Sequence, residues 1–195
     1  MAPGAPGHTR IVVILAGGGG TRLWPASTPA RPKQLLQLSE RPPTTLLAAA
    51  VERARRLVPL ERIFIVTNIA LVPAVQAAVP ELAAVNILPE PRGRSTAPCV
   101  ALALLHVRQR LRERGCSEEQ VARATLAVLP ADHHIGEVDL FTALLELACE
   151  QAEEQGGIVT LGVEPRGPST AYGYIERGPE PLARRGAAYV YPALR

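Results

Sequence analysis

Apolar residues recur along this chain in two distinct patterns. Runs rich in valine and isoleucine have the length and composition of buried strands. They cover residues 10–16, 62–67, 85–88, 125–130 and 158–163. Elsewhere apolar residues recur every three or four positions, which predicts amphipathic helices near residues 47–58, 100–111 and 141–152.

The second predicted helix illustrates this spacing. Val100, Leu104, Val107 and Leu111 share its predicted apolar face. Thr96 is predicted to cap the helix that Pro98 opens.

The order of these elements predicts a fold class. Strands that alternate with helices form a mainly parallel sheet with helices on both faces, a Rossmann-like three-layer α/β/α arrangement. Ligands of such sheets bind beyond the carboxyl ends of the strands. Because each unusual loop of this chain follows a predicted strand, we expect these loops to share one edge of the sheet. From residue 164 onward glycine, proline and tyrosine become frequent, and short strands such as 172–177 are expected.

Composition narrows the possible functions. The formal net charge is +3, basic residues are scattered and aromatic residues are few, which disfavours a nucleic-acid partner. The apolar runs are too short to cross a bilayer and the N-terminus has no apolar signal region, so we expect a cytoplasmic protein without a membrane partner. The cysteines form no Cys-x-x-Cys pair, which disfavours zinc and disulfides. Lys33 is the only lysine, and Asp132 and Asp139 are the only aspartates, so each invites a specific role.

The first predicted strand leads into a glycine-rich turn. Its residues are Leu15, Ala16, Gly17, Gly18, Gly19, Gly20, Thr21 and Arg22. Without side chains, backbone N–H groups can approach phosphate oxygens, and Arg22 adds a fork of donors. A Walker loop would need Gly-Lys-Ser/Thr, and a dinucleotide-binding turn would need glycine at position 22. A flexible tight turn is the structural alternative.

Lys33 follows this turn in a stiffened segment. Pro29 and Pro32 restrict the backbone around it. Its compact ammonium can neutralise charge between phosphates during group transfer, which makes Lys33 a candidate catalytic residue together with Arg22. A solvated surface lysine is the alternative.

The loop after the third predicted strand carries Glu90, Gly93, Arg94 and Thr96. It enters a helix, whose N-terminus favours anions. The Glu90 carboxylate can accept hydrogen bonds from N1–H and the exocyclic amino group of guanine. An ordinary helix cap is the alternative, although it explains Thr96 and not the whole run.

Asp132 follows the fourth predicted strand. An aspartate at this place is suited to hold Mg²⁺, which prefers hard oxygen ligands and bridges phosphates. His133 and His134 would point to opposite sides of an extended segment, so zinc is disfavoured. Asp139 more simply opens the next helix.

The segment after the fifth predicted strand is rich in small residues. They leave room for a ligand ring near Gly173, and Glu176 can accept hydrogen bonds from sugar hydroxyls. A hairpin with exposed tyrosines is the alternative.

Together these segments resemble the sugar-nucleotidyltransferase superfamily and, within it, the N-terminal portion of the mannose-1-phosphate guanylyltransferase family. The runs that carry the resemblance are AGGGGTRLWP at 16–25, PKQ at 32–34, EPRGRSTAP at 90–98, PADH at 130–133 and STAYGYIERG at 169–178. Five motifs in this order, each at a strand end, are hard to obtain by chance.

The resemblance implies a reaction and a set of roles. GTP and mannose 1-phosphate would give GDP-mannose and pyrophosphate, with Mg²⁺ on Asp132. The glycine turn and Arg22 would hold the GTP phosphates, Lys33 would assist the departing pyrophosphate, and Gly173 would lie near mannose. Residues 1–9 would be a disordered tail, residues 10–163 the nucleotide-binding domain and residues 164–195 the start of an incomplete sugar-binding region. A homo-oligomer is compatible with this assignment.

The chain also departs from the family pattern. Gly19 replaces a common serine, Ser95 replaces asparagine and Ala171 replaces glycine. The family's later Trp-Asn-Ser-Gly segment and second metal-binding carboxylate are expected beyond Arg195, so we expect a fragment or a shortened, inactive relative. The alternatives are a sister enzyme that uses dTTP, UTP or ATP, and a non-catalytic nucleotide-binding relative. Arg22 disfavours an NAD-dependent dehydrogenase.

Overall fold

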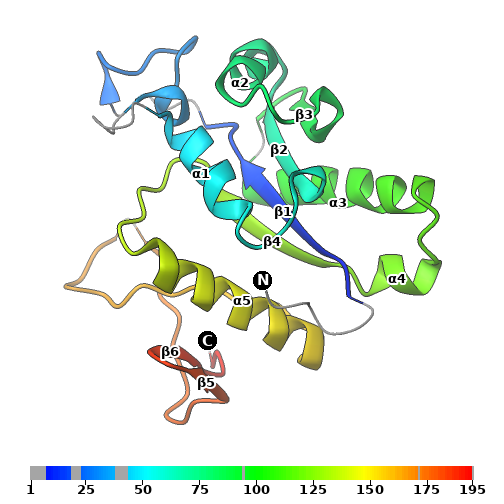
Figure 1. Cartoon of the computed structure of the whole chain (residues 1–195). Helices are drawn as coiled ribbons and strands as arrows, with labels where there is room; N and C mark the ends of the chain where they lie inside the picture. Colours follow the sequence, from blue (N-terminus) through cyan, green and yellow to red (C-terminus); the bar gives the residue numbers. More distant parts are fainter. Residues whose placement is uncertain (1–7, 19–22, 38–43, 94, 171, 195) are drawn as a thin grey trace. The chain divides into compact units, whose positions relative to one another are not determined.

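A computed structural model describes residues 8–18, 23–37, 44–93, 95–170 and 172–194. The chain divides into two compact units, Met1–Gly136 and Glu137–Arg195 (Figure 1). This division rests on packing alone, so the functional boundary expected after residue 163 stays a prediction.

The unit Met1–Gly136 is built on a parallel sheet (Figure 1). Its strands are β1 (Arg10–Leu15), β2 (Ile63–Asn68), β3 (Ile87–Glu90) and β4 (Thr125–Pro130). They lie in the order β3-β2-β1-β4, and every neighbouring pair is parallel. The predicted α/β class with a mainly parallel sheet is confirmed. β3 begins later than predicted because Ala84–Asn86 forms a short 3-10 turn, η5.

Helices connect these strands. They are α1 (Leu46–Ala54), α2 (Val72–Ala78), α3 (Thr96–Glu113) and α4 (Glu118–Ala122), with 3-10 turns η2 (Lys33–Leu35), η3 (Leu60–Arg62) and η4 (Ile69–Leu71). The Thr45 side chain caps α1 by accepting a hydrogen bond from the Ala48 N–H. Ser117 and Gln120 form a capping box on α4.

The predicted start and apolar face of α3 need correction. Ser95, at φ 73°, occupies the cap position, and Thr96 is the first helical residue rather than the cap. Val107 and Leu111 are buried as predicted, but Leu104 is 41% exposed. The buried stripe is Ala103, Val107 and Leu111, which follows a strict spacing of four.

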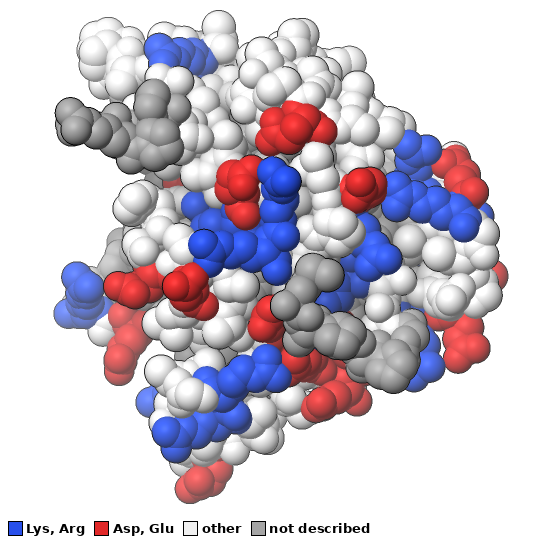
Figure 2. Space-filling view, in the orientation of Figure 1, with Lys and Arg blue, Asp and Glu red and all other residues white. Residues whose placement is uncertain are grey.

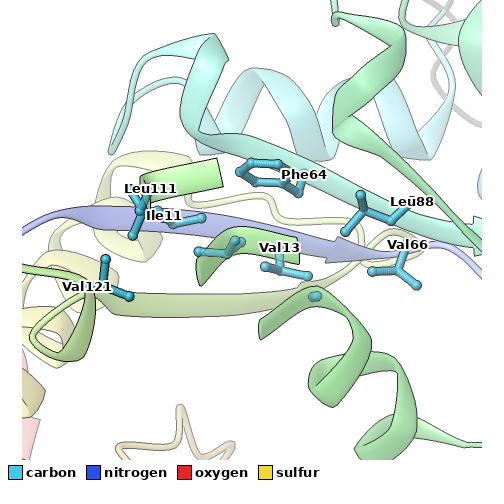
Figure 3. Close-up of a cluster of buried hydrophobic side chains, with 9 residues drawn as sticks. Ile11, Val13, Phe64, Val66, Leu88, Leu111 and Val121 are labelled. Atoms are coloured by element: carbon cyan, nitrogen blue, oxygen red, sulfur yellow. The ribbon is translucent and has the colours of Figure 1, made fainter. Parts of the chain in front are cut away.

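The core on one face of the sheet lies between the strands and α3 (Figure 3). Its buried members are Ile11, Val13, Phe64, Val66, Leu88, Ala103, Val107, Leu111 and Val121. On β1, the alternate residues Val12 and Ile14 are also fully buried, and they point to the opposite face, where α1 contacts β1. Burial on both faces explains why β1 reads as an unbroken apolar run.

The unit Glu137–Arg195 contains α5 (Val138–Gln155) and a hairpin of β5 (Ala183–Arg185) and β6 (Ala188–Val190). Gly156, at φ 66°, ends α5 in the left-handed conformation that favours glycine. The helix contacts β6, and Arg185 forms ion pairs with Glu146 and Glu150 of α5.

Two predicted strands of this unit are wrong. Residues 158–163 and the described part of 172–177 have no strand conformation, apart from a single bridge between Arg177 and Ala193. Ile158 is 96% exposed and Val163 is 92% exposed. A strand needs a hydrogen-bonded neighbour, and a valine-rich run without one does not become a strand. Within the described residues, no helix is long and apolar enough to span a membrane.

Replacing the central aromatic of the α3-facing core tests the packing. Phe64→Ala removes a ring that is 2% exposed, so we expect the free energy of unfolding to fall. The expected loss is about 3–5 kcal/mol in urea denaturation. Ile69→Ala, at a residue 59% exposed, is the matched control and should change stability by less than about 1 kcal/mol. Equal losses in the two variants would contradict this core.

Candidate active site

The carboxyl ends of the parallel strands bring separate loops of the chain to one edge. β1 leads to Gly17 and Gly18, β3 ends at Glu90, and β4 leads to Asp132. The prediction that these loops share an edge is therefore confirmed for the described residues. The predicted site residues Gly19, Gly20, Thr21, Arg22 and Arg94 lie outside them.

Lys33 and Asp132 meet at this edge. Lys33 opens η2 directly after Pro32, and its ammonium forms an ion pair with the Asp132 carboxylate. Their side chains are 35% and 23% exposed, so the pair is open to solvent and reachable by a ligand. Two residues that were selected from the sequence for different tasks, phosphate neutralisation and metal binding, thus lie in one place.

The turn after β4 is held by a residue from α1. Arg53 donates a hydrogen bond from Nη2 to the His133 carbonyl oxygen at 3.0 Å. Partial burial lowers the pKa of Arg53. His133 Nε2 lies 4.0 Å from Asp132 Oδ1. Arg53 was not predicted as a site residue, and nothing in its helical context distinguishes it from other arginines.

The donor set at Asp132 fits a magnesium ion that is shared with phosphates. Across the described ranges, no three His, Cys, Asp or Glu side chains gather to hold a metal ion by themselves. Magnesium in phosphate-transfer sites needs only one or two carboxylates, because phosphate oxygens and water complete its shell. Asp132, partly exposed after the strand that pairs with β1, would supply one such ligand.

Buried side chains donate hydrogen bonds to the start of the glycine turn. The Gln34 side-chain amide donates to the Ala16 carbonyl at 2.7 Å and to the Gly18 carbonyl at 3.3 Å. The Thr67 hydroxyl donates to the same Ala16 carbonyl at 3.1 Å. Gln34 and Thr67 were not predicted as site residues. The only sequence signal was the position of Gln34 beside Lys33.

Glu90 lies against the glycine turn and is 5% exposed. A Cβ atom at Gly17 would come within 3.2 Å of Glu90 Oε2, so the absence of a side chain there allows the close approach. The Cys99 thiol donates a hydrogen bond to Glu90 Oε1 at 3.1 Å. Burial and the neighbouring Glu90 carboxylate raise the pKa of Cys99 to about 11.

The remaining predicted site residues are more exposed to solvent than Glu90. Gly93 is exposed in the loop before α3, and Thr96 is exposed at the first position of that helix. In the other unit, Gly173 and Glu176 are exposed. That unit also has an open hollow of about 650 Å³. The hollow is lined by Pro165, Gly167, Pro168, Ser169, Thr170 and Tyr174. Neither Gly173 nor Glu176 lines it, so their role as sugar ligands stays a prediction.

Acidic and basic side chains of the described residues both lie on the face seen in Figure 2. Lys33 and Asp132 form one pair of opposite charges in the unit Met1–Gly136.

The fold and its ligand edge define an α/β domain of the nucleotide-binding type. Residues 11–185 match the nucleotidyl transferase family, and the chain belongs to this family. It is 37% identical to a mannose-1-phosphate guanylyltransferase of Escherichia coli K12 over 85% of this chain and 33% of the relative. It is also 37% identical to a mannose-1-phosphate guanylyltransferase of Sinorhizobium fredii, over 86% of this chain and 31% of the relative.

A solved structure is similar as well. The crystal structure described as mannose-1-phosphate geranyltransferase from Thermus thermophilus superposes with a TM-score of 0.72 at 38% identity. The match covers 94% of this chain and 49% of that chain. The chain thus spans about a third of the curated relatives and about half of the solved structure.

Alkylation of Cys99 tests its contact with Glu90. Because the pKa of Cys99 is raised to about 11, its reactive thiolate is scarce at pH 8 and increases as the pH approaches that value. Burial raises the pKa of Cys99 most, and the Glu90 carboxylate adds to that effect. Glu90→Gln removes this second contribution, so Cys99 in this variant should react with iodoacetamide several-fold faster at pH 8. Peptide mass spectrometry measures the rate, with Cys116 as the internal control. An unchanged Cys99 rate in Glu90→Gln would contradict the contact.

Proposed function

We propose that this chain forms the nucleotide-binding part of a mannose-1-phosphate guanylyltransferase, which converts GTP and mannose 1-phosphate to GDP-mannose and pyrophosphate. The observation that carries the proposal is the ion pair of Lys33 and Asp132 at the strand edge that also holds the glycine turn. The names of the relatives and their level of identity support the choice of guanosine and mannose.

The proposed reaction needs charge neutralisation more than acid–base chemistry. A phosphate oxygen of mannose 1-phosphate attacks the α-phosphorus of GTP, and the bond from that phosphorus to the pyrophosphate oxygen breaks. The attacking oxygen is already anionic, so no strong base is required. Two polyanions must approach each other, and positioning with neutralisation supplies most of the rate enhancement.

The candidate site residues have the following roles in this scheme. The Lys33 ammonium neutralises the α-phosphate and the departing pyrophosphate. Asp132 holds Mg²⁺, which screens the phosphate charge when it is bound. Amides of the glycine turn bind phosphate oxygens, and Glu90 accepts from the guanine edge. The Mg²⁺ cofactor, the cytoplasmic location and the sugar-side roles of Gly173 and Glu176 are parts of the same proposal.

Replacing Lys33 tests the catalytic assignment. We expect Lys33→Ala to lower turnover by about a hundredfold or more, on the order of 3 kcal/mol, because it removes the ammonium from the transferring phosphates. Pyrophosphate release with GTP and mannose 1-phosphate measures the effect. Arg31→Ala removes an exposed cation of the same segment and should keep turnover within about threefold. Intact turnover in Lys33→Ala would refute the role.

Two further measurements separate the alternatives. Competition of dTTP, UTP and ATP against GTP identifies a sister enzyme if another nucleotide displaces GTP. Tight GTP binding without pyrophosphate release, when mannose 1-phosphate is saturating, identifies the non-catalytic alternative.

Metal binding without nucleotide tests the pairing of Lys33 with Asp132. In the absence of GTP the ammonium competes with a divalent ion for the carboxylate, so Lys33→Met should bind Mn²⁺ about fivefold or more tightly than the unmodified chain. Asp132→Asn should lose this binding, and Arg31→Met should leave it unchanged. Electron paramagnetic resonance of free Mn²⁺ gives the affinities. Equal Mn²⁺ affinity in Lys33→Met and the unmodified chain would show that the pair does not compete with metal.

A further inference from the structure

The Gln34 side chain uses both of its amide hydrogens on the glycine turn. It is 2% exposed, and its Nε2 contacts the carbonyl oxygens of Ala16 and Gly18. A side-chain amide carries two donor hydrogens on that nitrogen, so the two acceptors match its full capacity. The amide therefore holds the carbonyl groups of Ala16 and Gly18, two residues apart in the turn, on one donor nitrogen.

Such an anchor matters because the four glycines of the turn have no side chains. Glycine adopts many backbone conformations, so consecutive glycines do not hold one arrangement by themselves. In a trans peptide the N–H points opposite to the C=O. When Gln34 draws the Ala16 carbonyl inward, the Gly17 N–H of the same peptide unit is directed to the other side. The buried amide thus orients peptide groups whose N–H atoms are the proposed phosphate ligands.

Lys33, the neighbour of Gln34 in the sequence, contacts a second loop of the candidate site. Lys33 reaches Asp132 after β4, while Gln34 reaches the turn after β1. Both residues belong to η2, a short 3-10 turn that begins after Pro32. One short segment therefore contacts both loops that the proposed function assigns to the triphosphate.

We infer that Gln34 is a positioning residue that fixes residues 16–18 of the glycine turn in the conformation that binds phosphates, and that η2 couples this part of the turn to the Lys33 ammonium. The inference rests on the proposed function for the identity of the ligand. The contact itself is independent of that identity, because it lies among residues of the chain.

The test replaces Gln34 by methionine, which keeps the length of the side chain and removes both donors. Calorimetric titration with GTP and with GMP gives the two affinities. We expect Gln34→Met to weaken GTP binding about tenfold or more and GMP binding less than threefold, because the lost orientation affects the phosphate ligands most. Gln37→Met, at an exposed glutamine of the same segment, is the matched control and should change both affinities less than twofold.

A second readout needs no nucleotide. The backbone order parameter of the Gly17 N–H, measured by NMR relaxation, should fall from about 0.85 to below about 0.6 in Gln34→Met and stay unchanged in Gln37→Met. Near-ultraviolet circular dichroism shows whether each variant keeps its fold. If Gln34→Met does not fold, Gln34→Ala replaces it in both measurements.

The outcomes distinguish this inference from the proposed function. If the unmodified chain binds no GTP, the proposed function fails, while a lower Gly17 order parameter in Gln34→Met still supports Gln34 as the anchor of the turn. If the chain binds GTP but Gln34→Met loses GTP and GMP affinity equally, or loses neither, the positioning role is overturned. An unchanged order parameter at Gly17 overturns it as well.

Discussion

Parallel pairing of β1 with a strand on each side is the constraint on which the rest of this structure depends. β1 lies between β2 and β4 and is buried on both faces. Because all neighbouring pairs in the sheet are parallel, the loops that follow the strands emerge at one edge. The glycine turn, Glu90 and Asp132 are therefore brought together by topology, although they are far apart in the sequence.

Charge balance at this edge follows from the pairing of Lys33 with Asp132. Taking one charge out of water is costly unless an opposite charge accompanies it. Both side chains are partly buried, and each satisfies the other in the absence of a ligand. In the proposed function each has a second partner, phosphate for the ammonium and a divalent cation for the carboxylate. In that proposal the two charges that pair with each other in the structure would recognise the phosphates and the divalent cation.

Periodicity predicted most of the fold, and strand-end chemistry selected Lys33 and Asp132, which form an ion pair in the structure. The apolar runs of β1, β2 and β4 and the stretch after β4 that carries Asp132 have local signals, namely aliphatic composition and an isolated aspartate. Residues 158–163 have the same composition but form no strand, because strand formation also depends on a pairing partner. Gln34, Thr67 and Arg53 were missed because their roles come from hydrogen bonds to main-chain atoms distant in sequence. Such contacts leave no periodic or compositional trace.

Because the chain has a single lysine, chemical labelling of amines can report on the site of the ion pair. Lys33 carries the only ε-amine of the chain. An amine-directed acylating reagent therefore modifies one side chain besides the α-amino group, and that side chain lies at the strand edge. A ligand that covers the Lys33 side chain would shield its amine from the reagent. The labelling rate of a single residue thus becomes a direct optical or mass-spectrometric reporter of site occupancy, without an engineered probe.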